Sequence, residues 1–192
     1  MIAVSRWIGH YLKRYPQVSV ESDFTGRIVD LVHEGFDLAI RIGPLTESSL
    51  AARRIGELHY GLFASPEYLS RRGMPESPEA LSQHELLTFT GGSYRQGWKL
   101  TRQEQEVFVP VSARLRVNNS FAVRDAAAQG LGVAQLPLTV ASSLPAMQQL
   151  TRVLPEWGSA PIPVHAVFPG LRYLTPKVRA FIDLAVETFS EC

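Results

Sequence analysis

Residues 115–137 read LRVNNSFAVRDAAAQGLGVAQLP, and this stretch predicts a strand, a polar turn, a helix and a second strand. At its start, apolar residues alternate with arginines, which is the period of a half-buried strand. Asn118, Asn119 and Ser120 can then cap a helix that begins at about Phe121. Gly130 provides the left-handed stop of that helix. The apolar residues after Gly130 predict a short buried strand.

The junction between the polar turn and the helix is a candidate ligand site. In open α/β sheets, ligands bind at the carboxyl ends of strands, where helix N-termini present unpaired N–H groups. Asn118, Asn119 and Ser120 stand at one such place. The same pattern also fits an ordinary βαβ unit whose polar turn only caps its helix, so the local sequence leaves both interpretations open.

Composition limits the class of protein. A chain of 192 residues, 45% hydrophobic and 19% charged, is long enough for one or two domains with a substantial core. Its net charge of +1 gives no reason to expect nucleic-acid binding by these residues. The single cysteine, Cys192, precludes an intramolecular disulfide and fits a reducing compartment. Without an apolar run of membrane-spanning length or a signal-peptide pattern, we expect a soluble cytoplasmic protein.

The first part of the chain alternates predicted helices and strands. The patterns indicate a helix over about 4–14, a strand over 18–24, a helix over 26–34 and a strand over 37–42. This alternation favours a mostly parallel sheet covered by helices. Later patterns predict strands around 51–55, 58–64, 87–89, 107–117, 150–154 and 164–168, and helices around 65–69, 81–87, 138–144 and 176–189.

This order of elements predicts two lobes. Residues 1–64 plus 166–192 form the first, and residues 65–165 form the second. Two strands, around 62–64 and 164–166, then cross between the lobes and act as a hinge. Two α/β lobes joined in this way leave a cleft, which is a common place for a small ligand.

Five motifs, in the same order along the chain, resemble the effector-binding domain of LysR-type transcriptional regulators. They are YPQVSVE at 15–21, LVHEGFDLAIRIG at 31–43, ASPEYL at 64–69, GLGVAQLP at 130–137 and TPKVRAF at 175–181. The resemblance covers nearly the whole chain. It implies an α/β fold of two Rossmann-like lobes joined by two crossover strands, like type 2 periplasmic binding proteins, with an effector between the lobes. It also implies dimerisation, and control of transcription through a separate N-terminal winged helix-turn-helix.

Two parts of the family's pattern are not matched in these residues. One is the helix-turn-helix with its linker helix. The other is the first strand of the effector domain, with the hydroxyl-bearing loop that usually contacts the effector, since the alignment places Met1 inside or just before the first helix. A parallel sheet without an interior strand exposes unpaired backbone on two neighbours. We therefore expect reduced stability and effector affinity.

The hinge interpretation places a set of strand ends around the effector. A helix N-terminus favours negative charge, so a small carboxylate or a polar aromatic acid is the expected effector. Arg41 is either a bidentate anchor for such a carboxylate or a structural residue that bonds loop carbonyls. The expected effector-binding residues are Arg41, Gly43, Thr88, Thr90, Asn119, Ser120, Gln135 and Pro137.

The resemblance also implies an antiparallel homodimer. In it, the first helix and strand of one subunit meet the second lobe of the other. The stripe of Trp7, Ile8 and Tyr11 on the first helix equally fits a core position, because such stripes are common in cores. The expected interface residues are Trp7, Ile8, Tyr11, Val18, Val20, Phe121 and Ala126.

Other chemistry is not indicated by the sequence. The five histidines are scattered and lack carboxylate or cysteine partners at metal-ligand spacing, so no metal site is expected. The Gly-x-Ser-x-Gly motif of serine hydrolases does not occur, and we expect neither an enzyme nor a cofactor. A solute-binding protein that serves a transporter shares the fold and is the alternative function. The LysR-like motifs and the lack of a signal-peptide pattern favour the regulator.

Overall fold

The chain divides into two compact units. The computed structural model describes residues 2–45, 50–90, 97–142, 150–170 and 174–189. Unit 1 comprises Met1–Glu57 and Ile162–Cys192, and unit 2 comprises Leu58–Pro161. The backbone passes between the units after residue 57 and again after residue 161. The strand segments 62–64 and 164–166, which we predicted as hinge crossings, lie within unit 2 and unit 1 respectively.

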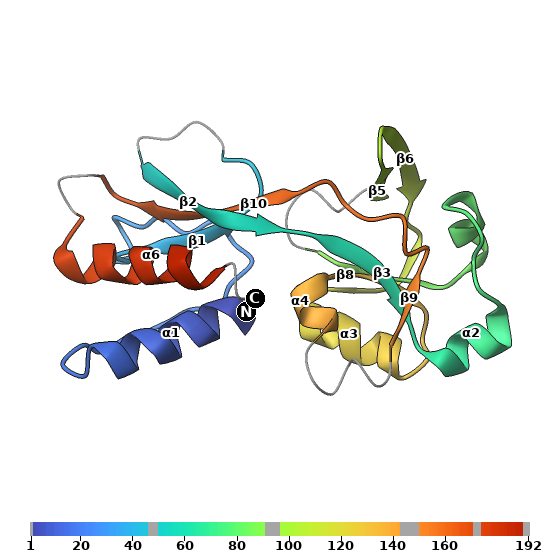
Figure 1. Cartoon of the computed structure of the whole chain (residues 1–192), viewed down its shortest axis with the longest axis horizontal. Coiled ribbons are helices and arrows are strands. Elements are labelled where there is room, and N and C mark those ends of the chain that lie inside the picture. Colours follow the sequence, from blue (N-terminus) through green and yellow to red (C-terminus); the bar gives the residue numbers. More distant parts are fainter. Residues whose placement is uncertain (1, 46–49, 91–96, 143–149, 171–173, 190–192) are drawn as a thin grey trace. The chain divides into compact units, whose positions relative to one another are not determined.

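Unit 1 consists of two helices and a three-stranded sheet (Figure 1). The strand order is β1-β10-β2, and β10 pairs antiparallel with β1 from Ala39 opposite Val167 to Ile42 opposite Val164. This pair contradicts the predicted mostly parallel sheet, because the second passage of the chain brings β10 back in the opposite direction. The elements are α1 (Ile2–Arg14), β1 (Ala39–Ile42), β2 (Ala51–Leu58), β10 (Ile162–Phe168) and α6 (Pro176–Phe189).

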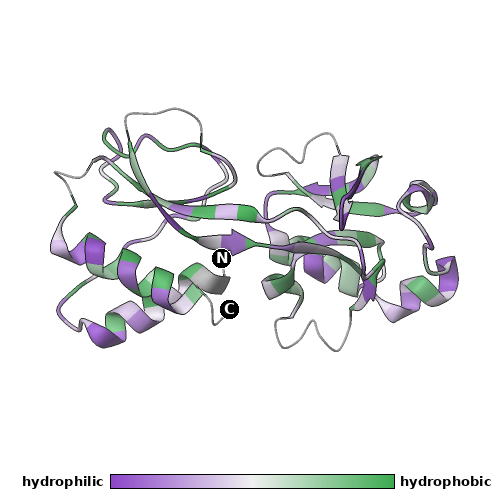
Figure 2. Cartoon of the chain, turned by 45° about the horizontal axis from the view of Figure 1, so that its top comes forward, coloured by the Kyte–Doolittle hydropathy of each residue, from purple (hydrophilic) through white to green (hydrophobic). Residues whose placement is uncertain are grey.

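Aromatic side chains join α1 to α6. The Trp7 ring lies 5.8 Å from that of Phe189, and the Tyr11 ring meets Phe181 edge-on at 5.3 Å. The Tyr11 hydroxyl also donates a hydrogen bond to the Lys177 carbonyl at 2.9 Å. Both helices are amphipathic, and hydrophobic and hydrophilic residues mix along their length (Figure 2). The predicted helix over 4–14 and the predicted start of the last helix at Pro176 are confirmed.

The segment between α1 and β1 differs from the prediction. No described residue pairs with the predicted strand over 18–24, and its Phe24 side chain is 49% exposed. The predicted helix over 26–34 is replaced by a single turn, in which the Asp30 carboxylate accepts hydrogen bonds from the backbone N–H groups of Val32 and His33. Both predictions are wrong. Of the stripe predicted for the helix, Leu31 is buried but Ile28 and Val32 are exposed, and apolar periodicity produces a regular element only where a neighbouring element buries the whole stripe.

That turn is held by its own polar side chains. Arg27 and Glu34 form a bidentate ion pair, and Glu34 also accepts from the Asp30 backbone N–H at 3.0 Å. These bonds lower the pKa of Glu34 to about 2. Ile28 and Val32, one turn apart, point outward and are 82% and 66% exposed.

Unit 2 is built on a mixed five-stranded sheet of order β7-β4-β8-β3-β9. Strand β4 runs parallel to β7 and β8, whereas β3 runs antiparallel to β8 and β9. Strands β5 and β6 form a separate hairpin. The elements are β3 (Tyr60–Ala64), α2 (Pro66–Arg72), the 3-10 helix η1 (Glu79–Gln83), β4 (Leu86–Phe89), β5 (Gly97–Arg102), β6 (Gln105–Pro110), β7 (Ala113–Val117), α3 (Ser120–Ala128), β8 (Val133–Pro137), α4 (Leu138–Ala141) and β9 (Thr151–Val153).

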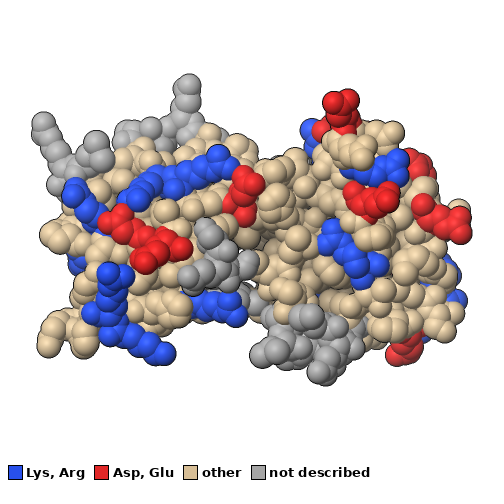
Figure 3. All heavy atoms as spheres, in the orientation of Figure 1, with Lys and Arg blue, Asp and Glu red and all other residues tan. Residues whose placement is uncertain are grey.

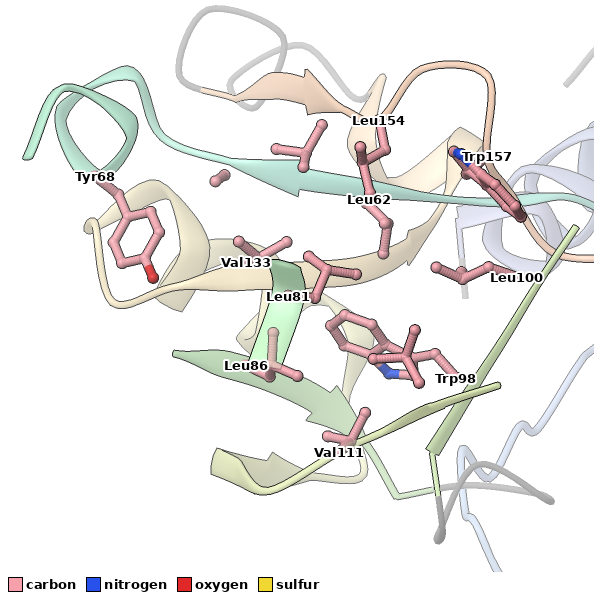
Figure 4. Close-up of a cluster of buried hydrophobic side chains, with 13 residues drawn as sticks. Leu62, Tyr68, Leu81, Leu86, Trp98, Leu100, Val111, Val133, Leu154 and Trp157 are labelled. Atoms are coloured by element: carbon pink, nitrogen blue, oxygen red, sulfur yellow. The ribbon is translucent and has the colours of Figure 1, made fainter. Parts of the chain in front are cut away.

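The stretch that predicted the fold is confirmed in unit 2. It forms β7, α3 and β8 in the expected order, and Gly130 has the left-handed φ of +74°. Alternate residues of β8 enter two different cores. Val133 belongs to the cluster shown in Figure 4, while Ala134 and Leu136 pack with α3 on the opposite face of the sheet. The sheet is therefore covered on both faces, as expected for a doubly wound α/β unit.

Gly132 is required where β8 begins. Its backbone lies so close to Glu85 that an added Cβ would overlap the Glu85 carbonyl oxygen, which accepts a hydrogen bond from the Val133 N–H at 2.8 Å. We expect Gly132→Ala to lower the free energy of unfolding by about 1–3 kcal/mol, measured by urea denaturation. Gly9→Ala is the matched control, because a Cβ at Gly9 on α1 meets no atom within 4 Å. That variant is expected to be neutral or more stable by about 0.5–1 kcal/mol, and equal losses in both variants would contradict the packing described.

Candidate functional site

The carboxyl ends of three strands meet along one edge of unit 2. Strand β4 is parallel to both of its neighbours, with Phe89 opposite Val117 of β7 and Leu87 opposite Ala134 of β8. The polar residues at or after these strand ends therefore lie along a common edge. Six predicted effector-binding residues share this edge: Thr88, Thr90, Asn119, Ser120, Gln135 and Pro137.

The N-terminus of α3 opens at this edge. Asn119 has an extended backbone, and its side-chain oxygen accepts hydrogen bonds from the N–H groups of Phe121 at 2.9 Å and Ala122 at 3.4 Å. The predicted capping role is thus confirmed for Asn119. Ser120 is the first helical residue and is partly exposed, so its hydroxyl is within reach of a ligand at the helix N-terminus. The positive end of the helix dipole favours a negatively charged group there.

Two polar side chains of the edge are buried. Thr88 is 2% exposed and Gln135 is 4% exposed. Strand alternation directs both toward the face that carries Leu86 and Val133. The Trp98 indole N–H donates to the Thr88 hydroxyl at 3.4 Å, whereas the Gln135 side-chain amide nitrogen has no hydrogen-bond partner among the described residues.

Trp98 was not foreseen as a neighbour of this edge. It lies in β5 of the separate hairpin and is fully buried, and Figure 4 shows its indole beside Leu81, Leu86 and Val111. The only signal in the sequence was a tryptophan in a segment of alternating apolar residues. Such a pattern does not say which sheet face a hairpin covers.

The remaining residues of the edge have structural contacts. The Thr90 backbone N–H donates to the Val117 carbonyl at 3.0 Å and so extends the β4–β7 pairing. Pro137 is buried at the end of β8, opposite Tyr60 of β3. Burial raises the pKa of Tyr60 to about 12, so its phenol stays neutral at physiological pH.

Arg41 and Gly43 lie in unit 1, at the end of β1. Arg41 is paired with His165 of β10 and is partly exposed. Among the residues that the structure describes, its guanidinium forms no hydrogen bond or ion pair. Gly43 has a φ of +109°, and its N–H donates to the Pro163 carbonyl at 2.8 Å. The positive φ explains the glycine by backbone conformation alone.

The predicted interface residues occupy different environments. Trp7 and Tyr11 are 1% and 3% exposed and belong to the core between α1 and α6. Ala126 is also buried, against the α3 face of the unit 2 sheet. These three side chains are not available to a partner in the folded chain. The accessible members of the predicted interface are Ile8, Val18, Val20 and Phe121.

Three other kinds of feature in the described residues would bear on function: metal-binding clusters, membrane-spanning helices and surface hollows. They contain no group of three or more histidine, cysteine, aspartate or glutamate side chains placed to hold a metal ion. Within the same residues, no helix is long and apolar enough to cross a membrane. Two surface hollows, one beside Arg14 and Arg179 and one beside Arg102 and Glu104, contain none of the predicted site residues.

Comparison with known proteins shows that the chain matches the model of one protein family. The chain matches the family model described as "LysR substrate binding domain" over residues 3–190. An HTH-type transcriptional repressor of Pseudomonas aeruginosa is 32% identical over 199 residues, which cover 100% of this chain and 62% of the relative. An uncharacterized HTH-type transcriptional regulator of Haemophilus influenzae is 32% identical over 168 residues, covering 88% of this chain and 58% of the relative.

Solved structures give the same result. The full-length Vibrio cholerae virulence activator AphB, described as a member of the LTTR protein family, superposes with a TM-score of 0.81 at 30% identity, covering 95% of this chain and 62% of AphB. The regulatory domain of CrgA, a LysR-type transcriptional regulator from Neisseria meningitidis, superposes with a TM-score of 0.82 at 26% identity, covering 96% and 90%. The chain thus spans about three fifths of the full-length proteins and most of an isolated regulatory domain.

Proposed function

Because this chain belongs to the LysR substrate binding domain family, with its type 2 periplasmic-binding-protein-like fold, we propose that it is the ligand-sensing part of a cytoplasmic transcription regulator. The observation that carries the proposal is the strand-end edge of unit 2, where Ser120 begins α3 on one face of the sheet and the buried Thr88 and Gln135 lie on the other face. It provides a helix N-terminus and buried polar groups in a domain whose relatives are named as regulators. Those names favour the regulator over the solute-binding alternative.

The proposed effector is a small molecule with an acidic group. The N-terminus of α3 supports this choice, because the positive end of the helix dipole favours an anion. In unit 1, Arg41 and Gly43 stay proposed effector-binding residues, because the Arg41 guanidinium matches a carboxylate.

DNA contact and assembly are proposed for the whole regulator. We assign DNA binding to a helix-turn-helix outside these 192 residues. The net charge of +1, and the mixture of acidic and basic residues on the face shown in Figure 3, support a role other than DNA contact for this part. A homodimer is proposed through the accessible residues Ile8, Val18, Val20 and Phe121.

A thermal-shift screen tests the sensing function. The purified chain is heated with each member of a library of small metabolites, and a true effector is expected to raise its melting temperature. A ligand at one hundred times its dissociation constant stabilises the native state by about 2.7 kcal/mol. Ser120→Leu should fold with an unchanged melting temperature but lose the shift, because the added side chain blocks the N-terminus of α3. Ser120→Ala is the control that removes only the hydroxyl.

Two outcomes would contradict this function or this site. If no metabolite stabilises the parent chain, the sensing function fails. If Ser120→Leu folds and is stabilised as much as the parent, the ligand binds away from the α3 N-terminus.

A further inference from the structure

A buried amide without a partner marks the candidate edge. The Gln135 side chain is 4% exposed, and its Nε2 atom has no hydrogen-bond partner among the described residues. The residue opposite Gln135 on the neighbouring strand β3 is Leu62, whose side chain cannot accept a hydrogen bond from the amide. The other buried nitrogen atoms without partners in the described residues are Trp7 Nε1, Arg152 Nε and His165 Nδ1, and none of them belongs to this edge.

Thr88 lies beside Gln135 on the adjacent strand. Leu87 and Ala134 are opposite one another in the parallel β4–β8 pair, so Thr88 and Gln135 are the next residues on each strand. Both point to the face that carries Leu86 and Val133. Continued by one residue, this register places the two buried polar side chains side by side on one face, with Thr88 one residue before the end of β4 and Gln135 in the middle of β8.

Both groups have hydrogen atoms left to donate. The Thr88 hydroxyl accepts from the Trp98 indole N–H and donates to the Phe89 carbonyl, both at 3.4 Å, and both contacts are longer than a normal hydrogen bond. Both Gln135 Nε2 hydrogens lack an acceptor among the described residues. The pair therefore has spare donors and needs an acceptor.

Packing alone does not account for a glutamine here. A methionine has nearly the same volume and length and would fill the space without an unsatisfied polar group. Leaving a buried donor unpaired costs free energy in the unliganded domain. Residues that cost stability in this way are typical of binding sites, where a ligand supplies the missing partner.

We propose that Thr88 and Gln135 form a paired donor site that binds one oxygen-bearing acceptor group of the effector, a carboxylate or an amide carbonyl, and so select the effector class. The inference rests on the proposed sensing function and adds the chemistry that is recognised. Trp98 is a positioning residue, because its indole N–H lies 3.4 Å from the Thr88 oxygen, and this long contact favours a hydroxyl hydrogen that points away from the indole. An effector that offers only donors, such as an amine, leaves the pair unsatisfied and is rejected.

The first arm of the test needs no ligand. Gln135→Met is expected to raise the melting temperature of the unliganded chain by at least about 3 °C, because it removes an unsatisfied buried donor. Gln83→Met is the matched control, since Gln83 is exposed, and it should change the melting temperature by less than about 1 °C. A melting temperature of Gln135→Met below that of the parent would show that Gln135 is bonded internally, and would overturn the inference.

The second arm uses matched probes in titration calorimetry. Each of two series offers an acid, an amide and an amine on a similar carbon skeleton. The aromatic series is benzoate, benzamide and benzylamine, and the aliphatic series is succinate, succinamide and putrescine. The parent is expected to bind acid or amide members at least tenfold more tightly than the amines, and Gln135→Met should lose at least tenfold of that affinity. Unchanged affinity in Gln135→Met, or preference of the parent for an amine, would overturn the paired donor site while leaving the sensing function intact. Binding of none of the acid or amide probes would overturn the assigned class, and the thermal-shift screen then decides the sensing function separately.

Discussion

Trp98→Ala is expected to lower the free energy of unfolding of unit 2 by about 3–5 kcal/mol. The side chain is completely buried and fills the space between the sheet and the hairpin, beside Leu86 and Val111 (Figure 4). Its loss removes a large apolar contact and leaves a cavity, and it also deprives the Thr88 hydroxyl of its indole donor. Urea denaturation followed by circular dichroism measures the change.

Phe108→Ala is the control for that prediction. Phe108 lies on β6, the other strand of the same hairpin, but is 58% exposed. Its loss should lower stability by about 1 kcal/mol or less, because the ring is more than half exposed and packs on the Gly97 backbone at the surface. Equal losses from the two variants would mean that the hairpin does not turn its Trp98 side toward the core.

Trp7→Glu is expected to destabilise unit 1 by roughly 3–5 kcal/mol, as for an uncompensated buried charge. Trp7 is 1% exposed and lies against Phe189 of α6. A carboxylate buried against that ring loses its hydration. Loss of helical circular dichroism at a lower temperature than in the parent measures the effect.

His10→Glu is the matched control, because it places the same carboxylate on an exposed position of α1. It should leave the melting temperature nearly unchanged. If Trp7→Glu keeps the parent's stability and only weakens self-association, Trp7 is an interface residue, as the family resemblance implied, and its assignment to the core is wrong.

Local sequence predicted the fold best where neighbouring elements bury the apolar face that the sequence indicates. The 115–137 stretch contains its own capping residue, glycine stop and two short strands, and the structure confirms each of them. The segment 18–34 has comparable periodicity but forms neither strand nor helix, because no described element covers Ile28 and Val32. Periodicity reports a potential apolar face, whereas the structure decides whether that face is buried.

The candidate site was predictable only in part. Parallel strands place their carboxyl ends at one edge, so Thr88 and Gln135 could be brought together from strand order alone. That both side chains are buried, and that Trp98 bonds to Thr88, depends on the packing of the β5–β6 hairpin against the sheet. Contacts of this kind join segments through tertiary structure and leave no periodic signal in the sequence.

The discontinuity of unit 1 has a consequence for the nascent chain on the ribosome. Strand β10 is the central strand of that sheet, and it is synthesised only after all of unit 2. The same holds for α6, the helix that covers Trp7 and Tyr11. Unit 2 is one continuous segment, so its folding can finish first although unit 1 begins first in the sequence. At typical rates of roughly 5–20 residues per second, α1 waits on the order of ten seconds for its partner helix. During that interval its apolar stripe is exposed, and holding chaperones have their best opportunity to bind this protein.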